Sequence, residues 1–286
     1  MTSLGEEKNL SSLVSDLYRL FDGDNDHIVS EDNLESFCVS IKELLRSRLR
    51  RDVPRTDPLR FSSLGRPDRQ LWYMARSTGE DFSSKHRLKF LYGDLIEQML
   101  LFLVKEAGHK VEHEQMELEV DGVKGHIDAV IDGVTVDVKS ASPLSYAKFE
   151  RGSLFEDDPF GYIGQISSYA SVLTPDTGGA FLAFDKVHGS ICVLNVGPSI
   201  TAAFSVPERV AHLREVIAKD TAPARCYPDE VDGKSGNRKL GTPCSYCSFK
   251  ESCWPGLRTF LYSGKPRFLT QVERTPDVYE VTKPDG

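Results

Sequence analysis

The stretch GHIDAVIDGVTVDVKSAS, residues 125–142, decides how the centre of this chain folds. Asp132-Gly133 is a two-residue turn signal, and the Val and Ile residues on both sides predict a β-hairpin. Counting outward from the turn places Asp128 opposite Asp137, and Lys139 shares the face of Asp137 because side chains alternate along a strand. Opposed like charges destabilise a sheet, so one interpretation is a divalent cation between the carboxylates. The other is an edge hairpin with its charges in water.

A third acid lies in the helix predicted before this hairpin. Residues 87–108, RLKFLYGDLIEQMLLFLVKEAG, have the amphipathic pattern of a helix that stops at Gly108. Glu97 stands beside Ile96 in the apolar part, and a glutamate among core residues needs a partner. We therefore expect Glu97 to reach the same metal ion as Asp128. The alternative is a partly exposed glutamate on the flank of the helix.

The segment after the hairpin, FGYIGQISSYASVL, residues 160–173, is also predicted to be helical. Gln165 and Tyr169 are four residues apart and therefore share one face of that helix. Both side chains could form hydrogen bonds with a nucleotide or with the metal-site acids. The alternative is that Tyr169 packs in the core and Gln165 is solvated.

Taken in order, these residues resemble the PD-(D/E)XK nuclease superfamily, specifically its RecB-like exonuclease branch. That family has an acid on the first core helix, Asp on the second strand, Asp/Glu-x-Lys on the third and Gln-x-x-x-Tyr on the following helix. The chain departs from the pattern at Gly93, where many members have His, and at Ile127, where the family name has Pro. The matches lie between residues 60 and 200: Glu97, Asp128, Asp137-Val138-Lys139, Gln165 and Tyr169.

The resemblance implies an α/β fold with a restriction-endonuclease-like core, in which helices flank a mixed central sheet. It also implies that the three acids bind one or two Mg²⁺ or Mn²⁺ ions, with the carbonyl of Val138 as a further oxygen ligand. Lys139 would orient or help to deprotonate the attacking water and stabilise the negative charge on the phosphate. Gln165 and Tyr169 would position the strand.

The composition agrees with a soluble enzyme. The chain has 286 residues, enough for one core domain with additions, and no apolar run is long enough to cross a bilayer. The first residues, MTSLGEEKNL, lack the pattern of a signal peptide, so we expect a cytoplasmic protein of a bacterial or phage-infected cell. In that reducing compartment the six cysteines are expected to be metal ligands or core residues rather than disulfides.

Positive charge is concentrated in one block although the net charge is −8. Residues 41–90 hold thirteen Lys or Arg against six acids, whereas residues 1–40 hold nine acids and two bases. The basic block can supply phosphate contacts, and a solvated charged helix is the alternative for its first part. Residues 59–76, LRFSSLGRPDRQLWYMAR, add aromatic rings for base stacking. The predicted DNA contacts are Arg60, Ser62, Ser63, Arg69 and Tyr73.

The C-terminal cysteines form a second candidate metal site. Cys244, Cys247 and Cys253 have the spacing C-x2-C-x5-C, and Cys226 is the expected fourth ligand. Four thiolates suit either an iron–sulfur cluster or tetrahedral zinc. Cys38 competes for the fourth place, but it stands at an apolar helical position and is expected to be a core thiol. The same fate is expected for Cys192, in a strand-like stretch.

This cysteine spacing resembles the C-terminal cluster ligands of AddB and of the CRISPR-adaptation nucleases. Residues 62–73 also resemble a stretch of some RecB-like nucleases in which a cysteine is the first cluster ligand. This chain has Pro67 at that place. The resemblance favours an iron–sulfur cluster, whereas the compact arrangement of four cysteines in one loop-rich segment favours zinc.

The sequence therefore predicts three parts: an N-terminal helical region (1–58), a nuclease core (59–221) and a cysteine-rich C-terminal segment (222–286). The run RRDVPRTDP, residues 50–58, is the predicted linker, and the last thirty residues are expected to be extended. Within the core we expect helices over 85–107, 157–173 and 201–218, and strands over 110–120, 123–131, 134–140, 178–185 and 190–196.

The expected function is that of a metal-dependent DNA nuclease, an exonuclease acting on DNA ends or single strands. Repair, recombination or phage DNA processing is the implied setting, with recombination or replication proteins as partners. One alternative is a non-catalytic nucleic-acid-binding module, which the intact set of Asp128, Asp137 and Lys139 argues against. The other is a scaffold that recruits a repair complex through the cysteine-metal site.

Overall fold

The computed structural model describes residues 8–23, 26–49, 59–77 and 84–281, which divide into two compact units. Unit 1 contains residues 1–65 and 81–212, and unit 2 contains residues 66–80 and 213–286. This division differs from the expected three parts, because residues 66–80 join the C-terminal segment rather than the core. The predicted linker, residues 50–58, lies outside the described residues.

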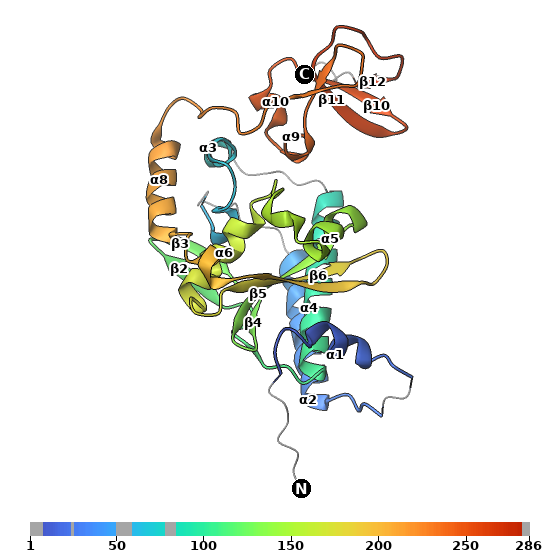
Figure 1. Cartoon of the computed structure of the whole chain (residues 1–286), viewed down its shortest axis with the longest axis vertical. Helices are drawn as coiled ribbons and strands as arrows, with labels where there is room; N and C mark the ends of the chain where they lie inside the picture. The colour runs from blue at the N-terminus through green and yellow to red at the C-terminus, as the bar shows by residue number, and fades with distance from the viewer. Residues whose placement is uncertain (1–7, 24–25, 50–58, 78–83, 282–286) are drawn as a thin grey trace. The chain divides into compact units, whose positions relative to one another are not determined.

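Unit 1 is an α/β structure with a five-stranded sheet at its centre (Figure 1). Its helices are α1 (Leu13–Arg19), α2 (Glu31–Leu49), η1 (Phe61–Ser63), α4 (Ser84–Glu106), α5 (Pro143–Glu150), η2 (Ser153–Phe155), α6 (Tyr162–Leu173), α7 (Pro198–Thr201) and the start of α8 (Val206–Ala218). Its strands are β1 (Val111–Glu112), β2 (Glu117–Val120), β3 (Val123–His126), β4 (Ala129–Ile131), β5 (Val134–Ala141), β6 (Gly179–Asp185) and β7 (Ile191–Val196).

The strand order in the central sheet is β1-β4-β5-β6-β7. Only the pair β5–β6 is parallel, and the other pairs are antiparallel, so the expected mixed sheet is confirmed. The parallel pair follows from the crossover through α5 and α6, because parallel strands require a long connection. Strands β2 and β3 form a separate two-stranded sheet.

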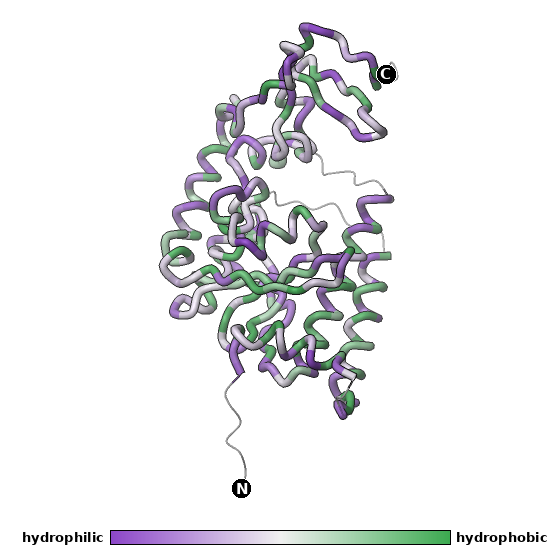
Figure 2. The backbone as a smooth tube through the Cα atoms, turned by 45° about the vertical axis from the view of Figure 1, so that its right-hand side comes forward, coloured by the Kyte–Doolittle hydropathy of each residue, from purple (hydrophilic) through white to green (hydrophobic). Residues whose placement is uncertain are grey.

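Each face of the central sheet is covered by helices, as Figure 1 shows. On one face, α1 and α4 pack against alternate residues of β5, including Val136 and Val138. On the other, α5 and α6 pack against Phe181 and Ala183 of β6. The strands of this sheet are mostly hydrophobic in Figure 2, as expected for strands buried on both faces. Asp137 and Lys139 interrupt that pattern on the α6 face.

The predicted hairpin forms as β4 and β5. Asp132 and Gly133 have φ angles of 48° and 78°, the left-handed pair that a type I′ turn needs. The register is the predicted one for three pairs, ending at Ala129↔Val136. The expected pairing of Asp128 with Asp137 does not occur, because Asp128 lies just before β4 and outside the ladder.

Two expected strands are interrupted. The strand predicted over 110–120 is split into β1 and β2, because His113 and Gln115 take positive φ angles of 56° and 52°. The strand predicted over 123–131 is split into β3 and β4 at Ile127 and Asp128. Residues that are depleted in strands recur in both stretches, Glu in the first and Gly and Asp in the second, and the tertiary contacts described below complete the breaks. Helix α5 was not expected from the sequence.

Unit 2 is built around a second five-stranded sheet, with the order β12-β10-β11-β9-β8. Its elements are α3 (Asp68–Arg76), β8 (Glu230–Val231), β9 (Arg238–Lys239), α9 (Thr242–Tyr246), α10 (Lys250–Cys253), β10 (Arg258–Tyr262), β11 (Lys265–Gln271) and β12 (Glu280–Val281), together with the end of α8. Strands β10, β11 and β12 lie in the part of the chain that was expected to be extended, residues 257–286, of which residues 282–286 lie outside the described residues. In the described parts of both units, no helix combines the length and apolar character needed to cross a membrane.

Candidate functional site

The centre of the candidate site is a polar network on the α6 face of β5. The Lys139 ammonium lies 2.6 Å from Oδ2 of Asp137, as two residues on the same face of one strand can. Gln165 of α6 bridges the pair, since its Nε2 donates to Asp137 Oδ1 at 2.8 Å and its Oε1 accepts from Lys139 at 3.3 Å. Lys139 also lies over the ring of Tyr162, at 4.7 Å. Gln165 is therefore part of the acid–lysine network rather than solvated.

Asp128 reaches the same place from the end of β4. Its Oδ2 accepts a hydrogen bond from the amide of Val138 at 2.7 Å. The carboxylate thus takes the place that the next backbone carbonyl of β4 would have in a continued ladder. The N–H and C=O of one strand residue point to the same edge of the strand. The carbonyl of Val138 therefore faces the edge of β5 where Asp128 lies.

Glu97 is connected to Asp128 through a residue that the sequence analysis missed. Nε2 of Gln115 donates to Glu97 Oε1 at 2.5 Å, and the backbone N–H of Gln115 donates to the carbonyl of Asp128 at 3.1 Å. Gln115 makes both contacts from a left-handed conformation between β1 and β2. The sequence contains no distinct signal for it, because Gln115 is one of several polar residues in this stretch.

Burial and mutual repulsion hold protons on two of the acids. The pKa of Glu97 is raised to about 9 by burial, and further by the charges of Asp128, Asp94 and Asp137. The pKa of Asp128 is raised to about 7 by burial and by the charge of Asp137. Asp94, one helical turn before Glu97, is a further acid near the site, and it is paired with Arg48 at 2.5 Å. Such a set of acids favours binding of a cation, which would relieve the repulsion.

The acids have the oxygen ligands that a hard divalent cation needs, but their present positions do not form a complete binding site. Oδ2 of Asp137 is buried and has no partner with hydrogen-bond geometry, although the Lys139 ammonium stands close to it. A metal ion is one partner that would complete such an oxygen. Throughout residues 8–23, 26–49, 59–77 and 84–281, however, no three His, Cys, Asp or Glu side chains are arranged as ligands in their present positions. Binding would therefore draw the side chains of Glu97, Asp128 and Asp137 together.

Tyr169 supports the site from the core. It is 3% exposed and stacks on Phe61 of η1, with ring centroids 5.2 Å apart. Burial is the main cause that raises the pKa of Tyr169 above its usual range, and the charges of Asp137 and Asp128 raise it further. A Cβ at Gly125 would stand 2.5 Å from Cβ of Phe61 and 2.8 Å from the hydroxyl of Tyr169, so only glycine fits there. Tyr169 therefore packs in the core, beside the acids.

The predicted DNA contacts fall in both units. In unit 1, Arg60 is half-buried and forms a backbone bridge with Lys124, while Ser62 is exposed. Ser63 is buried, and its hydroxyl hydrogen-bonds to the backbone of Arg60. In unit 2, Arg69 and Tyr73 lie on α3. The Tyr73 ring stacks on Phe249 at 5.7 Å, and its hydroxyl donates to the carbonyl of Ser252.

The four predicted cysteine ligands all belong to unit 2. The pKa of Cys244 is raised to about 11, by burial first and then by the charges of Cys247, Cys253 and Cys226. The four thiols are thus near enough to oppose one another's ionisation, a repulsion that a bound metal ion would remove.

N–H groups point at the sulfurs. Cys226 accepts from the amides of Arg69 and Gln70, which lower a pKa that burial raises. Cys247 likewise accepts from the amide of Phe249. The buried indole N–H of Trp254 has no partner with normal hydrogen-bond geometry, but it lowers the pKa of Cys244. Such donors favour the anionic sulfur that a metal needs, so the chemistry of these residues fits a thiolate-bound metal. As with the acids of unit 1, no three of the four sulfurs, all in the described part of unit 2, are arranged as ligands in their present positions, so metal binding would draw the cysteine side chains together.

The two other cysteines differ from each other. Cys38 is exposed on α2, a helix with no buried residue, so the expectation of a core thiol is wrong for Cys38. Helix α2 packs on α4 through Phe37, which contacts Phe102, whereas Leu34 and Val39 beside Cys38 are exposed. Cys192 of β7 is half-buried and packs against the cluster that includes Phe181, as expected.

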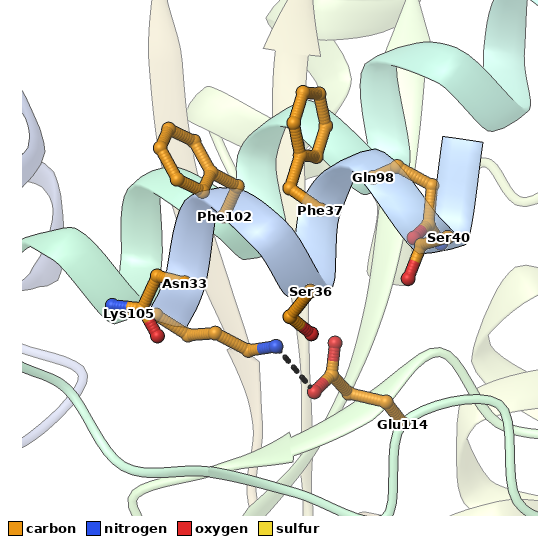
Figure 3. A pocket seen from close by; sticks show the side chains of 8 residues that line it. All are labelled: Asn33, Ser36, Phe37, Ser40, Gln98, Phe102, Lys105 and Glu114. Atoms are coloured by element: carbon orange, nitrogen blue, oxygen red, sulfur yellow. Dashed lines mark ion pairs between the residues drawn. The ribbon is translucent and has the colours of Figure 1, made fainter. Parts of the chain in front are cut away.

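A shallow surface pocket lies elsewhere in unit 1, between α2 and α4 (Figure 3). Phe37 and Phe102 line it, with ring centroids 5.0 Å apart, and an ion pair joins Lys105 to Glu114 at 2.6 Å. None of the predicted catalytic residues lines this pocket. The pocket is small, and its two charged side chains, Lys105 and Glu114, already pair with each other, so we do not assign it a substrate.

No protein-family model matches this chain, and no curated protein matches its sequence.

Proposed function

We propose that unit 1 is a metal-dependent DNA nuclease of the PD-(D/E)XK type, with a restriction-endonuclease-like core. The observation that supports this most is the network of Asp137, Lys139 and Gln165 beside Asp128. It combines acidic oxygens for a cation with a fixed positive charge, on one face of one strand. Phosphodiester hydrolysis needs both, because negative charge develops on the phosphate while water attacks it.

Glu97, Asp128 and Asp137 would hold one or two Mg²⁺ or Mn²⁺ ions, with the carbonyl of Val138 as a further oxygen ligand. Oxygen-rich sites suit these hard cations. A bound ion supplies Lewis-acid chemistry, which lowers the pKa of water and offsets phosphate charge. Gln115 keeps Glu97 in place, and the amide of Val138 orients Asp128.

Lys139 is best suited to stabilising charge. Burial alone would lower its pKa, but Asp137 and the other charges around it keep that pKa above the usual value. A lysine with a raised pKa remains protonated at neutral pH and does not accept a proton from water. We therefore assign Lys139 the role of stabilising the phosphate, with Gln165 fixing its position through the 3.3 Å contact.

DNA, at its ends or as single strands, is the proposed substrate, which makes the enzyme an exonuclease of repair, recombination or phage DNA processing. Arg60 and the exposed Ser62 adjoin Phe61, which packs on Tyr169 of the site helix. Both belong to unit 1, as the acids do. Recombination or replication proteins in a cytoplasmic setting remain the proposed partners.

The cysteines of unit 2 would hold an iron–sulfur cluster, with zinc as the alternative. Four thiolates suit either metal centre. A scaffold role for unit 2, recruiting other proteins, is the second candidate function, since the cysteine site does not share residues with the acids of unit 1.

The proposal is tested by a time course on linear DNA labelled at either the 5′ or the 3′ end, beside a closed circle. We expect Mg²⁺- or Mn²⁺-dependent loss of label from the linear DNA, an intact circle, and no reaction in a chelator. Cleavage of the circle would assign an endonuclease instead. Equal degradation with and without divalent metal, or none in either, would rule out the proposed chemistry.

A further inference from the structure

Arg69 of α3 is turned toward a cysteine sulfur. Its Nε donates to Sγ of Cys253 at 3.1 Å. The other two nitrogens of the guanidinium donate to the carbonyl of Pro223 and, at 3.3 Å, to the hydroxyl of Tyr73. Every edge of the planar group is therefore used within unit 2, so its orientation is fixed.

Helix α3 also contacts a second sulfur, that of Cys226, through its backbone amides. Helix α3 begins after Pro67, which has no side-chain acceptor for the first amides of the helix. The amides of Arg69 and Gln70 donate instead to the thiol of Cys226. A cysteine from a distant part of the chain thus supplies the cap that Pro67 lacks, and α3 lies against the sulfurs of both Cys226 and Cys253.

Charge explains why an arginine is useful at this place. Four thiolates around one metal centre carry excess negative charge, and hydrogen bonds from a cation to an anionic sulfur offset part of it. Two other cations lie nearby: Lys250 hydrogen-bonds to the carbonyl of Cys247, and Arg225 hydrogen-bonds to the carbonyl of Cys253. Of these three cations, Arg69 is the one whose side chain hydrogen-bonds to a sulfur.

We propose that Arg69 is a positioning residue that donates its charge to the metal-bound thiolate of Cys253, and thereby slows metal release from the cysteine site. The inference rests on the cysteine-metal site proposed above, and it gives Arg69 a role other than the DNA contact expected from the sequence. Arg76 provides a matched control on the same helix, because its guanidinium contacts carbonyl oxygens and the Trp72 ring but no sulfur.

The experiment compares the full-length wild type with Arg69→Gln, Arg69→Lys and Arg76→Gln, all purified anaerobically. Elemental analysis gives iron and zinc per chain. Metal release is then followed after adding excess chelator, by visible absorption for a cluster or by a zinc-sensitive dye. We expect Arg69→Gln to release metal about 10-fold faster than wild type. Arg69→Lys should be intermediate, because it keeps the charge but not the fork, and Arg76→Gln should match wild type.

Equal release rates for wild type and Arg69→Gln, with metal bound to both, would overturn the role of Arg69 and leave the cysteine site standing. A wild-type protein with neither iron nor zinc would overturn both. If circular dichroism shows Arg69→Gln to be unfolded, Arg69→Lys decides, and a wild-type release rate for that variant contradicts the inference. DNA cleavage by the wild type tests the nuclease proposal separately.

Discussion

Oδ2 of Asp128 lies 2.7 Å from the backbone nitrogen of Val138, so a side chain completes the edge of β5 where β4 ends. This contact positions Asp128 beside Asp137 without requiring the two residues to pair in the ladder. It also leaves the carbonyl of Val138 on the same edge as the acids. A break in a strand, rather than a continuous hairpin, thus creates the acidic site.

The raised pKa of Glu97 predicts that the metal-free protein is less stable at high pH. A carboxyl with a folded pKa of about 9 binds its proton more tightly in the folded state. Stability associated with that proton is present at low pH and is lost as pH rises from the unfolded pKa, about 4.5, to about 9. Glu97→Gln should therefore become increasingly more stable than wild type across this range, as measured by urea unfolding in a chelator.

Glu208→Gln is the matched control, since Glu208 is exposed on α8. Adding Mg²⁺ should stabilise the wild type at high pH and have less effect on Glu97→Gln. A constant stability difference between Glu97→Gln and wild type from about pH 5 to about pH 9 would show that Glu97 is not a destabilised acid.

Gly125→Ala should disturb the packing beneath the site. The new Cβ would stand 2.5 Å from Cβ of Phe61, so Phe61 and Tyr169 would have to move. Overpacking of this kind costs about 1–3 kcal/mol, measurable by thermal or urea unfolding. Gly197→Ala is the control, because a Cβ there meets nothing within 4 Å and its φ of −61° suits alanine. A loss of stability no larger than that of Gly197→Ala would contradict the packing account.

The sequence predicted the parts of the fold that depend on local signals. The Asp132-Gly133 turn, the period of two in β5 and the apolar face of α4 were sufficient to place Asp137, Lys139 and Glu97 near one another. The interruption at Asp128 and the role of Gln115 were not predictable, because both depend on hydrogen bonds between segments far apart in the sequence. The same is true of Arg69, whose basic and aromatic neighbours are equally typical of a DNA contact.

A buried charge cluster should make α1 sensitive to acid. Oδ2 of Asp16 lies 2.8 Å from the Lys8 ammonium and 3.2 Å from Nε2 of His109, whose Nδ1 is 2.6 Å from Asp132. The hydrogen bond from Lys8 lowers the pKa of Asp16, although burial opposes this. The stability that this shift contributes is present above the unfolded pKa of about 3.8 and is lost as pH falls below it.

Asp16→Asn should therefore destabilise the protein by about 1 kcal/mol at neutral pH, since it removes the charge-assisted hydrogen bond from Lys8. The deficit should shrink at low pH in urea unfolding. Asp22→Asn, at an exposed position, should have little effect. A deficit that is the same at low and neutral pH would mean that the Asp16 charge is not responsible.

Arg60→Ala should weaken DNA binding and reduce its salt dependence. A lost phosphate contact lowers the slope of log affinity against log salt by about 1. Lys186→Ala, which removes an exposed charge after β6, serves as the control. Fluorescence anisotropy with a short single strand over a salt series provides the measurement. An unchanged slope would mean that Arg60 does not face phosphate.

The most direct measurement is single-turnover cleavage of labelled linear DNA by wild type, Asp128→Asn and Lys139→Gln in Mg²⁺, with binding measured on the same samples. We expect each variant to cleave at least about 100-fold more slowly, because Asp128→Asn weakens a proposed metal ligand and Lys139→Gln removes the charge that stabilises the phosphate. Binding should change little, and Asp176→Asn, at an exposed position, should cleave like wild type. Cleavage by Asp128→Asn or Lys139→Gln within about threefold of wild type would contradict the account, because effects of such groups on the transition state are far larger.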